Sequence, residues 1–227
     1  MTTTLITGAN KGLGFETARR LIAAGHTVVL GSRDAGRGRE AAERLGAELL
    51  ILDVTSDESV AAAAASLSEL DVLVNNAGIA GDLAAPADVT ADSMRAVYDT
   101  NVFGVVRMIH AFLPLLEKSP APVIVNVGSG LGSMTRATDP AAMASTLIPV
   151  AYASAKAAVT MLTVQYAKAY PGMRINCADP GYTATDLNGH QGTQTVAEGA
   201  EIIVRMAQTA PDGPTGGFFD RHGVVPW

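Results

Sequence analysis

The sequence contains a single cysteine, Cys177, among 227 residues. An intramolecular disulfide and a metal site of several cysteines are therefore excluded. The four histidines, His26, His110, His190 and His222, are scattered without the spacing of metal ligands, so we expect no metal.

Long apolar runs and a surplus of positive charge are also lacking. No stretch reaches about 18 uninterrupted apolar residues, the length that spans a membrane. The N-terminus has no basic region followed by an apolar segment, so no signal peptide is expected. The 16 basic residues are outnumbered by 22 acidic ones, which disfavours nucleic acid as a partner. We expect a soluble cytoplasmic protein with no membrane or nucleic-acid partner.

Short apolar runs alternate with segments of helical periodicity along the whole chain. The candidate strands are Leu5–Thr7, Thr27–Leu30, Glu48–Leu52, Val72–Asn75, Val123–Val127 and Arg174–Ala178, with a late run at Thr215–Phe219. The candidate helices are Gly12–Ala24, Asp34–Leu45, Ser56–Leu70, Ala91–Leu116, Ala151–Ala169 and Thr195–Gln208. This alternation predicts an α/β fold, a doubly wound parallel sheet (Rossmann fold) with helices on both faces. No linker or repeat interrupts it, so residues 1–227 are interpreted as one domain.

A glycine-rich turn separates the first candidate strand from the first helix and reads Thr7-Gly8-Ala9-Asn10-Lys11-Gly12-Leu13-Gly14. Gly8 permits the tight exit from the strand, Gly12 lets a pyrophosphate approach the backbone, and Gly14 lets the helix pack closely on the sheet. Backbone N–H groups and the positive end of the helix dipole then face the phosphates. Glycines in this position predict dinucleotide binding.

The end of the second strand distinguishes the two nicotinamide dinucleotides. An acidic side chain there would accept a hydrogen bond from the ribose of NAD, but residues 31–34 read Gly-Ser-Arg-Asp. Arg33, Arg37 and Lys11 can converge on a 2′-phosphate, which guanidinium groups bind well. The alternative is that Arg37 and Arg39 belong to a solvated helix face. We expect NADP(H) as the cofactor.

Tyr152 and Lys156 lie four positions apart at the start of the candidate helix Ala151–Ala169, so both side chains share one face. A tyrosine ordinarily loses its proton near pH 10. An ammonium about 4 Å away contributes roughly 4 kcal/mol at an effective dielectric of 20, which lowers the tyrosine pKa by up to roughly three units. The pair therefore predicts an acid or base usable near neutral pH. Such pairs also occur as mere neighbours on a helix surface. The pair indicates catalysis because the same chain contains the glycine turn.

Taken together, these motifs resemble the short-chain dehydrogenase/reductase family, in its single-domain, carbonyl-reductase-like branch. The resemblance extends over essentially the whole chain. The further motifs that carry it are Asp53-Val54, Asn75-Asn76-Ala77-Gly78, Asn101, Ser129 and Pro180-Gly181-Tyr182-Thr183-Ala184-Thr185-Asp186. It implies hydride transfer between NADP(H) and a small carbonyl or alcohol substrate, and it leaves a monomer, a dimer and a tetramer open.

The resemblance implies a role for each of four candidate catalytic residues. Tyr152 donates the proton to the substrate oxygen, and Ser129 hydrogen-bonds the same oxygen. Lys156 holds the nicotinamide ribose and lowers the pKa of Tyr152, while Asn101 anchors a water that connects Lys156 to solvent. Physical reasoning agrees, because hydride arriving at a carbonyl carbon builds negative charge on the oxygen, where two hydroxyl donors should converge.

The resemblance also implies contacts with the cofactor at the ends of several candidate strands. Residues 53–54 border the adenine, and the backbone of residues 76–78 passes under its ribose. Residues 180, 181 and 183 flank the nicotinamide, and Thr185 reaches its amide or the pyrophosphate. The Arg33/Arg37 pair also resembles the basic residues of the NADPH-selective members of this branch. The full candidate set is Gly8, Asn10, Lys11, Gly12, Leu13, Gly14, Arg33, Arg37, Asp53, Val54, Asn76, Ala77, Gly78, Tyr152, Lys156, Pro180, Gly181, Thr183 and Thr185.

The chain departs from the family pattern around the candidate serine. Members usually have two serines where this chain reads Gly128-Ser129, which leaves Ser133 as a rival. Ser129 is preferred because it ends the strand and precedes the glycine-rich residues 130–132. The segment Met134–Pro149 is longer than in the shortest members. We expect it over the active site, where it either shapes an apolar pocket or covers a surface that relatives use to oligomerise.

A polar, glycine-rich segment, Thr183–Gly199, follows Pro180-Gly181 and is typical of a mobile substrate lid. His190 within it is interpreted as solvent-exposed, the alternative being a contact with substrate. Cys177 is interpreted as a buried apolar residue of the sheet.

Two other functions share part of this pattern. A nucleotide-sugar epimerase has the same tyrosine and lysine, but the short remainder of the chain after Pro180 leaves no room for its substrate domain. A non-catalytic NADP(H)-binding sensor would keep the fold and lose the chemistry, whereas Ser129, Tyr152, Lys156 and Asn101 are all present. We therefore favour a carbonyl reductase acting on a modest, neutral compound.

Overall fold

The computed structural model of the chain describes residues 1–82 and 84–227. Within these residues, eight strands form one sheet in the order β3-β2-β1-β4-β5-β6-β7-β8. All neighbouring pairs are parallel except β7 and β8. The strands are β1 (Thr3–Thr7), β2 (Thr27–Ser32), β3 (Glu48–Ile51), β4 (Val72–Asn75), β5 (Val123–Val127), β6 (Arg174–Ala178), β7 (Phe218–Asp220) and β8 (Gly223–Val224).

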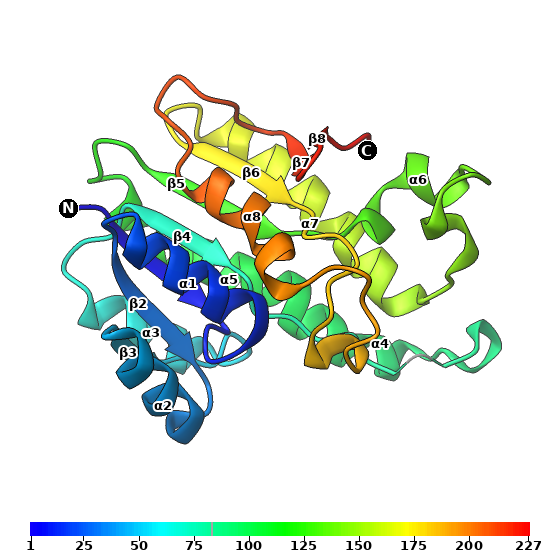
Figure 1. Cartoon of the computed structure of the whole chain (residues 1–227), viewed down its shortest axis with the longest axis horizontal. Helices are drawn as coiled ribbons and strands as arrows, with labels where there is room; N and C mark the ends of the chain where they lie inside the picture. Colours follow the sequence, from blue (N-terminus) through cyan, green and yellow to red (C-terminus); the bar gives the residue numbers. More distant parts are fainter. Residues whose placement is uncertain (83) are drawn as a thin grey trace.

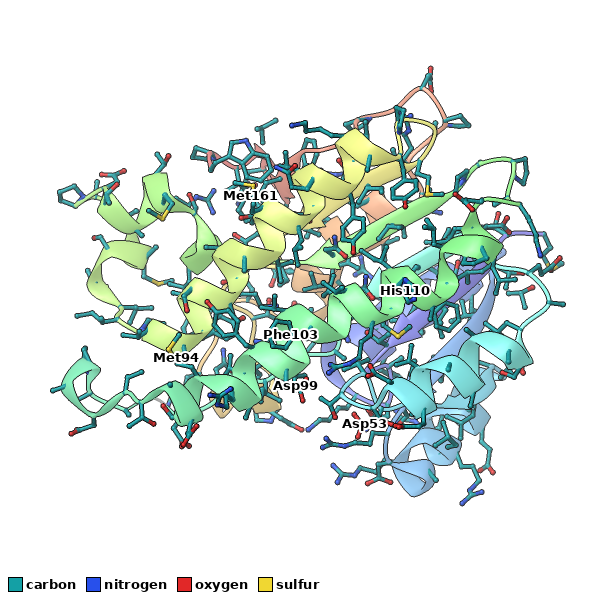
Figure 2. All side chains as sticks on the ribbon, turned by 180° about the vertical axis from the view of Figure 1, so that it is seen from behind. Asp53, Met94, Asp99, Phe103, His110 and Met161 are labelled. Carbon is teal, nitrogen blue, oxygen red and sulfur yellow. The ribbon has the colours of Figure 1, made fainter. Side chains whose placement is uncertain are left out.

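Helices cover both faces of the sheet and create two separate apolar cores. Figure 1 looks onto the face with α1, α2 and α8, and Figure 2 looks onto the opposite face with α3, α5 and α7. The α-helices are α1 (Gly12–Ala23), α2 (Ala35–Leu45), α3 (Asp57–Ser66), α4 (Ala91–Tyr98), α5 (Gly104–Leu116), α6 (Met134–Thr138), α7 (Val150–Ala169) and α8 (Val196–Ala207). The predicted doubly wound α/β fold in one domain is confirmed.

The strands carry apolar residues to both cores because alternate side chains point to opposite faces. In β1, for example, Leu5 belongs to the core under α3, α5 and α7, whereas Ile6 belongs to the core under α1, α2 and α8. Both side chains are fully buried. Burial on two faces explains why these strands are continuous apolar runs in the sequence.

The C-terminal strand region differs from the sequence-based prediction. The predicted strand Thr215–Phe219 begins only at Phe218. Gly216 has a φ of 72°, which turns the chain, and Thr215 bonds through its hydroxyl to the backbone of Met173 and Ile175. The two-residue strand β8, which the sequence did not indicate, then pairs antiparallel with β7.

The long predicted helix Ala91–Leu116 is continuous in space but changes its winding in the middle. Between α4 and α5 lies the π-helical turn η2 (Asp99–Phe103). A π turn inserts an extra residue into a helix and occurs frequently at functional sites. Here it contains the candidate residue Asn101, which is buried.

The parallel arrangement brings the loops that follow β1 to β6 to one edge of the sheet. The strand order reverses between β1 and β4, and open α/β sheets bind their ligands at such a switch point. The glycine-rich turn follows β1 at this point, and residues 76–78 follow β4.

In the described residues, no helix combines the length and the apolar character needed to cross a membrane.

Candidate active site

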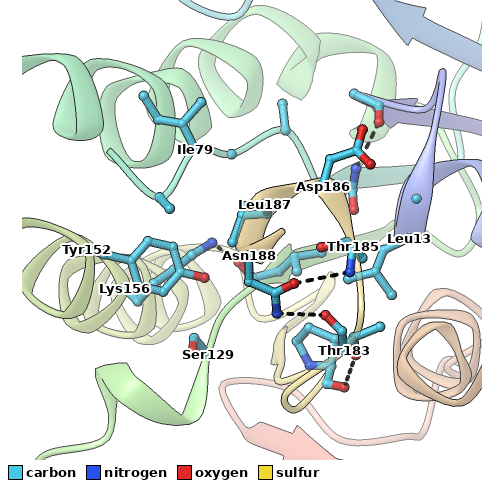
Figure 3. Close-up of a pocket in the computed structure, with 18 of the residues that line it drawn as sticks. Leu13, Ile79, Ser129, Tyr152, Lys156, Thr183, Thr185, Asp186, Leu187 and Asn188 are labelled. Atoms are coloured by element: carbon cyan, nitrogen blue, oxygen red, sulfur yellow. Dashed lines mark hydrogen bonds between the residues drawn. The ribbon is translucent and has the colours of Figure 1, made fainter. Parts of the chain in front are cut away.

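A cavity of about 1320 Å³ runs along this edge of the sheet (Figure 3). Every candidate site residue predicted from the sequence lines it, except Asn101. Its walls come from the loops after β1 to β6, from the segment 134–149 and from the segment 183–191. Loops far apart in sequence therefore meet around one elongated space.

The glycine turn forms the floor of the cavity at its β1 end. Gly8 and Gly12 have φ angles of 63° and 55°, in the left-handed region that favours glycine. Gly14 has no room for a side chain, because a Cβ atom would lie 2.6 Å from Asn76 Nδ2 and 2.7 Å from Gly8 O. A Cβ on Gly12 would instead point into open space, 3.8 Å from Thr185 Cγ2. Gly14 thus serves packing, and Gly12 leaves backbone open to a ligand.

The end of the cavity near β2 carries two exposed arginines. Arg33 lies 3.9 Å from the Asp53 carboxylate, and Arg37 pairs with Asp34 at 2.7 Å. Their side chains are 75% and 64% exposed. Arg39 is exposed and lies outside the cavity lining, so it belongs to the solvated face of α2.

Lys11 was expected to join these arginines, but its ammonium lies 2.6 Å from Asp186 of the segment 183–199. Asp186 also accepts from His190 at 2.8 Å. His190 is exposed and outside the cavity lining. The salt bridge between Lys11 and Asp186 connects the glycine turn to this segment across the cavity.

Tyr152, Lys156 and Ser129 lie at the other end of the cavity (Figure 3). Tyr152 and Lys156 occupy adjacent turns of α7, and the Lys156 Nζ lies 5.6 Å from the centre of the Tyr152 ring. Lys156 is buried and donates to Val127 O at 2.7 Å. Ser129 follows β5 directly, and its hydroxyl accepts from Leu131 N at 3.3 Å.

The expected lowering of the pKa of Tyr152 was wrong for this arrangement. Burial raises the pKa of Tyr152 to about 12, and a side-chain hydrogen bond with Ser129 offsets only part of that rise. Burial also lowers the pKa of Lys156 to about 8. The prediction placed an ammonium at the phenol and took no account of desolvation, whereas this ammonium bonds to Val127 O. In this arrangement desolvation is therefore the larger effect.

The side-chain amide of Asn101 hydrogen-bonds to the loop that follows β4. Its Oδ1 accepts from Ile79 N and its Nδ2 donates to Ile79 O, both at 2.9 Å. A Cβ on Gly78 would lie 3.3 Å from Asn101 Oδ1 and 3.8 Å from Lys156 Nζ. The π turn thus delivers Asn101 to the loop after β4, beside Lys156.

Comparison with known proteins identifies this combination of fold and site. The family described as short chain dehydrogenase matches residues 2–195. The short-chain dehydrogenase/reductase 1 of Saponaria officinalis is 36% identical over 98% of this chain and 95% of its own length. A (+)-neomenthol dehydrogenase of Capsicum annuum is 32% identical over 97% and 96%. The crystal structure of an NADPH-bound carbonyl reductase from chicken fatty liver superposes with a TM-score of 0.87, at 27% identity over 100% of this chain and 99% of that one.

This chain belongs to the short-chain dehydrogenase/reductase family. It is accordingly an oxidoreductase with a site for a nicotinamide cofactor. The residues fit such a cofactor, because the glycine turn leaves backbone exposed along the cavity and a side chain at Gly12 would protrude into it. The cavity is also large enough for a dinucleotide and a substrate together.

The departure of this dehydrogenase from the family pattern at Gly128 has a steric reason. A Cβ at Gly128 would collide with Cys177 Sγ, and it would lie 3.2 Å from Phe218 Cε2. The rival residue Ser133 caps α6 and donates to Pro226 O at 2.6 Å. Ser133 does not line the cavity, whereas Ser129 does.

The segment Met134–Pro149 of the dehydrogenase forms α6 and the 3₁₀ turn η4 (Met143–Thr146) and lines the cavity. The segment Thr183–Gly199 crosses the cavity with the 3₁₀ turn η5 (Asp186–Asn188), and its last residues, 196–199, already belong to α8. A bridge between Thr183 and Gln194 closes the base of this segment. Both segments thus contribute walls to the site.

Sequence reasoning missed the ionic cluster of Arg136, Asp179 and Asp220 at the edge of the site. Arg136 Nη1 donates to Asp179 Oδ2 at 3.1 Å, and Nη2 donates to Asp220 Oδ2 at 2.7 Å. Burial raises the pKa of Asp179, against hydrogen bonds from backbone and Arg136. A signal was available, because Asp179 directly follows the apolar strand β6 and must therefore lie at the ligand-binding edge of the sheet.

Proposed function

We propose that this chain is an NADP(H)-dependent carbonyl reductase that acts on an uncharged, largely apolar ketone or aldehyde and oxidises the corresponding alcohol in reverse. The observation that carries the proposal is the meeting of two hydroxyl groups, Tyr152 and Ser129, with the glycine-rich turn in one cavity. A carbonyl oxygen placed between those hydroxyls gains two donors where negative charge develops.

Tyr152 is proposed as the proton donor to that oxygen. A pKa of about 12 keeps its phenol protonated throughout the physiological range, as a donor requires. Ser129 orients the carbonyl, and Lys156 binds the nicotinamide ribose while Asn101 holds the adjoining loop. A bound nicotinamide cofactor supplies the hydride, and the protein supplies position and proton.

NADP(H) rather than NAD(H) is proposed because two guanidinium groups, of Arg33 and Arg37, stand at the cavity end near β2. Guanidinium forks match phosphate oxygens in geometry and charge. Asp53 at the same end is engaged by Thr55, since its Oδ1 accepts from both Thr55 N and Thr55 Oγ1. The remaining proposed cofactor contacts are Gly8, Asn10, Lys11, Gly12, Leu13, Gly14, Val54, Asn76, Ala77, Gly78, Pro180, Gly181, Thr183 and Thr185, all of which line the cavity.

An apolar, uncharged substrate is proposed from the cavity walls beside Tyr152. Apolar side chains from the loops after β4, β5 and β6 line the same cavity as Tyr152: Ile79, Leu131, Met143, Leu147, Ile148 and Leu187. The only arginine of segment 134–149, Arg136, has both terminal nitrogens bonded to carboxylates, so it offers no ready partner to an anionic substrate. The similarity to a (+)-neomenthol dehydrogenase supports this substrate class.

The test is NADPH consumption, followed by absorbance, with a panel of cyclic ketones, aldehydes and quinones. Each apolar ketone should be paired with an analogue that carries a carboxylate at the far end. We expect turnover of the apolar compounds and a much lower kcat/KM for the charged analogues, because a buried carboxylate without a cation is costly. Tight NADPH binding with no oxidation across the whole panel would contradict the proposal and support a cofactor-binding sensor.

A further inference from the structure

The ionic cluster of Arg136, Asp179 and Asp220 reaches the backbone on both sides of the proposed reaction site. Asp179 Oδ1 accepts from Gly181 N at 2.9 Å. The backbone of Gly130 lies against the other oxygen of this carboxylate and lowers the Asp179 pKa. Asp179 thus binds the turn after β5, which carries Ser129, and the turn after β6, which carries Pro180.

The contact with the first turn is close. A Cβ on Gly130 would lie 2.9 Å from Asp179 Oδ2 and 3.0 Å from Arg136 Nη1, so a side chain here would displace the ends of both groups. The Asp179 side chain is 5% exposed, and that of Asp220 is 14% exposed. Burying a carboxylate is costly unless its oxygens accept hydrogen bonds. Gly181 N and Arg136 Nη1 provide these bonds to Asp179.

The two carboxylates of the cluster have different surroundings. Asp220 Oδ1 accepts from His222 N and Gly223 N in the turn between β7 and β8. Asp220 does not line the cavity, whereas Asp179 does. The Asp179 charge acts electrostatically on Tyr152 and Lys156 of α7 and on Cys177 of β6, and Asp179 in turn experiences the charges of Arg136 and Asp220. Its negative charge raises the pKa of Tyr152.

We propose that Asp179, held by Arg136, is a positioning residue that fixes the Ser129–Gly130 and Pro180–Gly181 turns on either side of the reacting atoms. A carboxylate suits this role because Oδ1 accepts from Gly181 N while Oδ2 accepts from the Arg136 guanidinium and lies against the Gly130 backbone. The inference rests on the proposed function, since the atoms it positions are those assigned to the reaction. A clamp that serves only the fold would lower the melting temperature when it is removed and would leave the kcat of the folded protein unchanged.

The matched pair Asp179→Asn and Asp220→Asn separates these roles. Each variant replaces a carboxylate beside the same arginine by a neutral amide of nearly the same volume. For Asp179→Asn we expect kcat to fall about ten- to a hundredfold, the range for losing a hydrogen bond to a charged group, while the KM for the ketone changes little. Asp220→Asn should keep a kcat close to that of the unaltered protein. Equal losses of kcat in the two variants would overturn the proposal.

A second readout does not depend on turnover. Tyrosine labelled with ¹³C at Cζ reports phenol ionisation by NMR, and the Tyr152 signal is assigned by its absence from Tyr152→Phe. Because the Asp179 charge raises the pKa of Tyr152, the signal should begin to titrate at lower pH in Asp179→Asn than in Asp220→Asn. The same titration curve in both variants would overturn the placement of the Asp179 carboxylate at the reaction site.

A conservative variant keeps the test decisive where Asp179→Asn does not fold. Arg136→Lys retains the positive charge but loses the fork, so we expect a folded protein with a reduced kcat. A kcat equal to that of the unaltered protein in Arg136→Lys would overturn the proposal. Full activity in Tyr152→Phe would instead contradict the proposed function, and the NMR titration would still test the placement of Asp179.

Discussion

The glycine turn permits a quantitative test, because alanine substitutions at two nearby glycines are expected to be harmful for different reasons. Gly14→Ala places a methyl group 2.6 Å from Asn76 Nδ2, 2.7 Å from Gly8 O and 2.9 Å from Ala9 Cα. Two of these atoms are backbone, so the methyl group cannot be accommodated by a side-chain rotation alone. The Asn76 amide that it displaces donates to Thr7 O at 2.8 Å and to Gly8 O at 3.2 Å.

The cost follows from these contacts. Overpacking costs about 1–3 kcal/mol. Weakening the Asn76 bonds adds about 1 kcal/mol. Replacing glycine by alanine in a helix returns up to about 1 kcal/mol. A net loss of about 2 kcal/mol corresponds to a decrease in Tm of roughly 4–8 °C in a chain of this size.

Thermal unfolding measures this change, and two alanine variants are its controls. Gly36→Ala lies in the first turn of α2, where the nearest atom to the new Cβ is Asp34 Oδ1 at 3.4 Å, so its Tm should be unchanged or higher. Gly12→Ala has a φ of 55° and costs about 1–2 kcal/mol of strain, but its methyl group points into the cavity, so NADPH affinity should fall further than Tm suggests. A Tm of Gly14→Ala equal to or above that of the unaltered protein would contradict this steric cost.

Two further predictions concern charged groups. Replacing Arg33 and Arg37 together by alanine should lower kcat/KM for NADPH about ten- to a hundredfold, an effect moderated by their exposure, and should leave kcat/KM for NADH nearly unchanged; an unchanged preference for NADPH would contradict the cofactor assignment. Hydrogen bonds from Thr195 and Arg221 hold the pKa of Glu198 at about 2 in the fold, below its ordinary 4.5. Glu198 therefore stabilises the fold above about pH 4.5 and loses that contribution as the pH falls towards 2. Urea unfolding of Glu198→Gln and the unaltered protein should differ at pH 6 and converge near pH 2, and a constant difference would count against it.

The sheet could be predicted from the sequence because its strands are short apolar runs buried on both faces. The strands Val72–Asn75, Val123–Val127 and Arg174–Ala178 match to the residue. The two-residue strand β8 could not be predicted, since its pairing with β7 depends on the turn that Asp220 holds. The π turn at Asn101 was also invisible, because helical periodicity continues through it.

The lining of the site could be predicted because parallel strands send consecutive loops to one edge. Contacts between distant charges could not. Lys11 meets Asp186 across 175 positions, and Arg136 meets Asp220 across 84, with no pattern in the sequence that joins them. The pKa of Tyr152 was misjudged for a related reason, since the degree of burial and the direction of the Lys156 ammonium depend on the packing of α7 against β5.

The central claim is that Tyr152 donates the proton that accompanies hydride transfer to a carbonyl. Its most direct test is a single turnover with NADPH deuterated at the transferred position, in the unaltered protein and in Tyr152→Phe, with NADPH affinity measured separately. The unaltered protein should place deuterium on the carbinol carbon of the product. Tyr152→Phe should bind NADPH with similar affinity and transfer deuterium about 10²- to 10⁴-fold more slowly. Transfer at an unreduced rate in that variant would contradict the account.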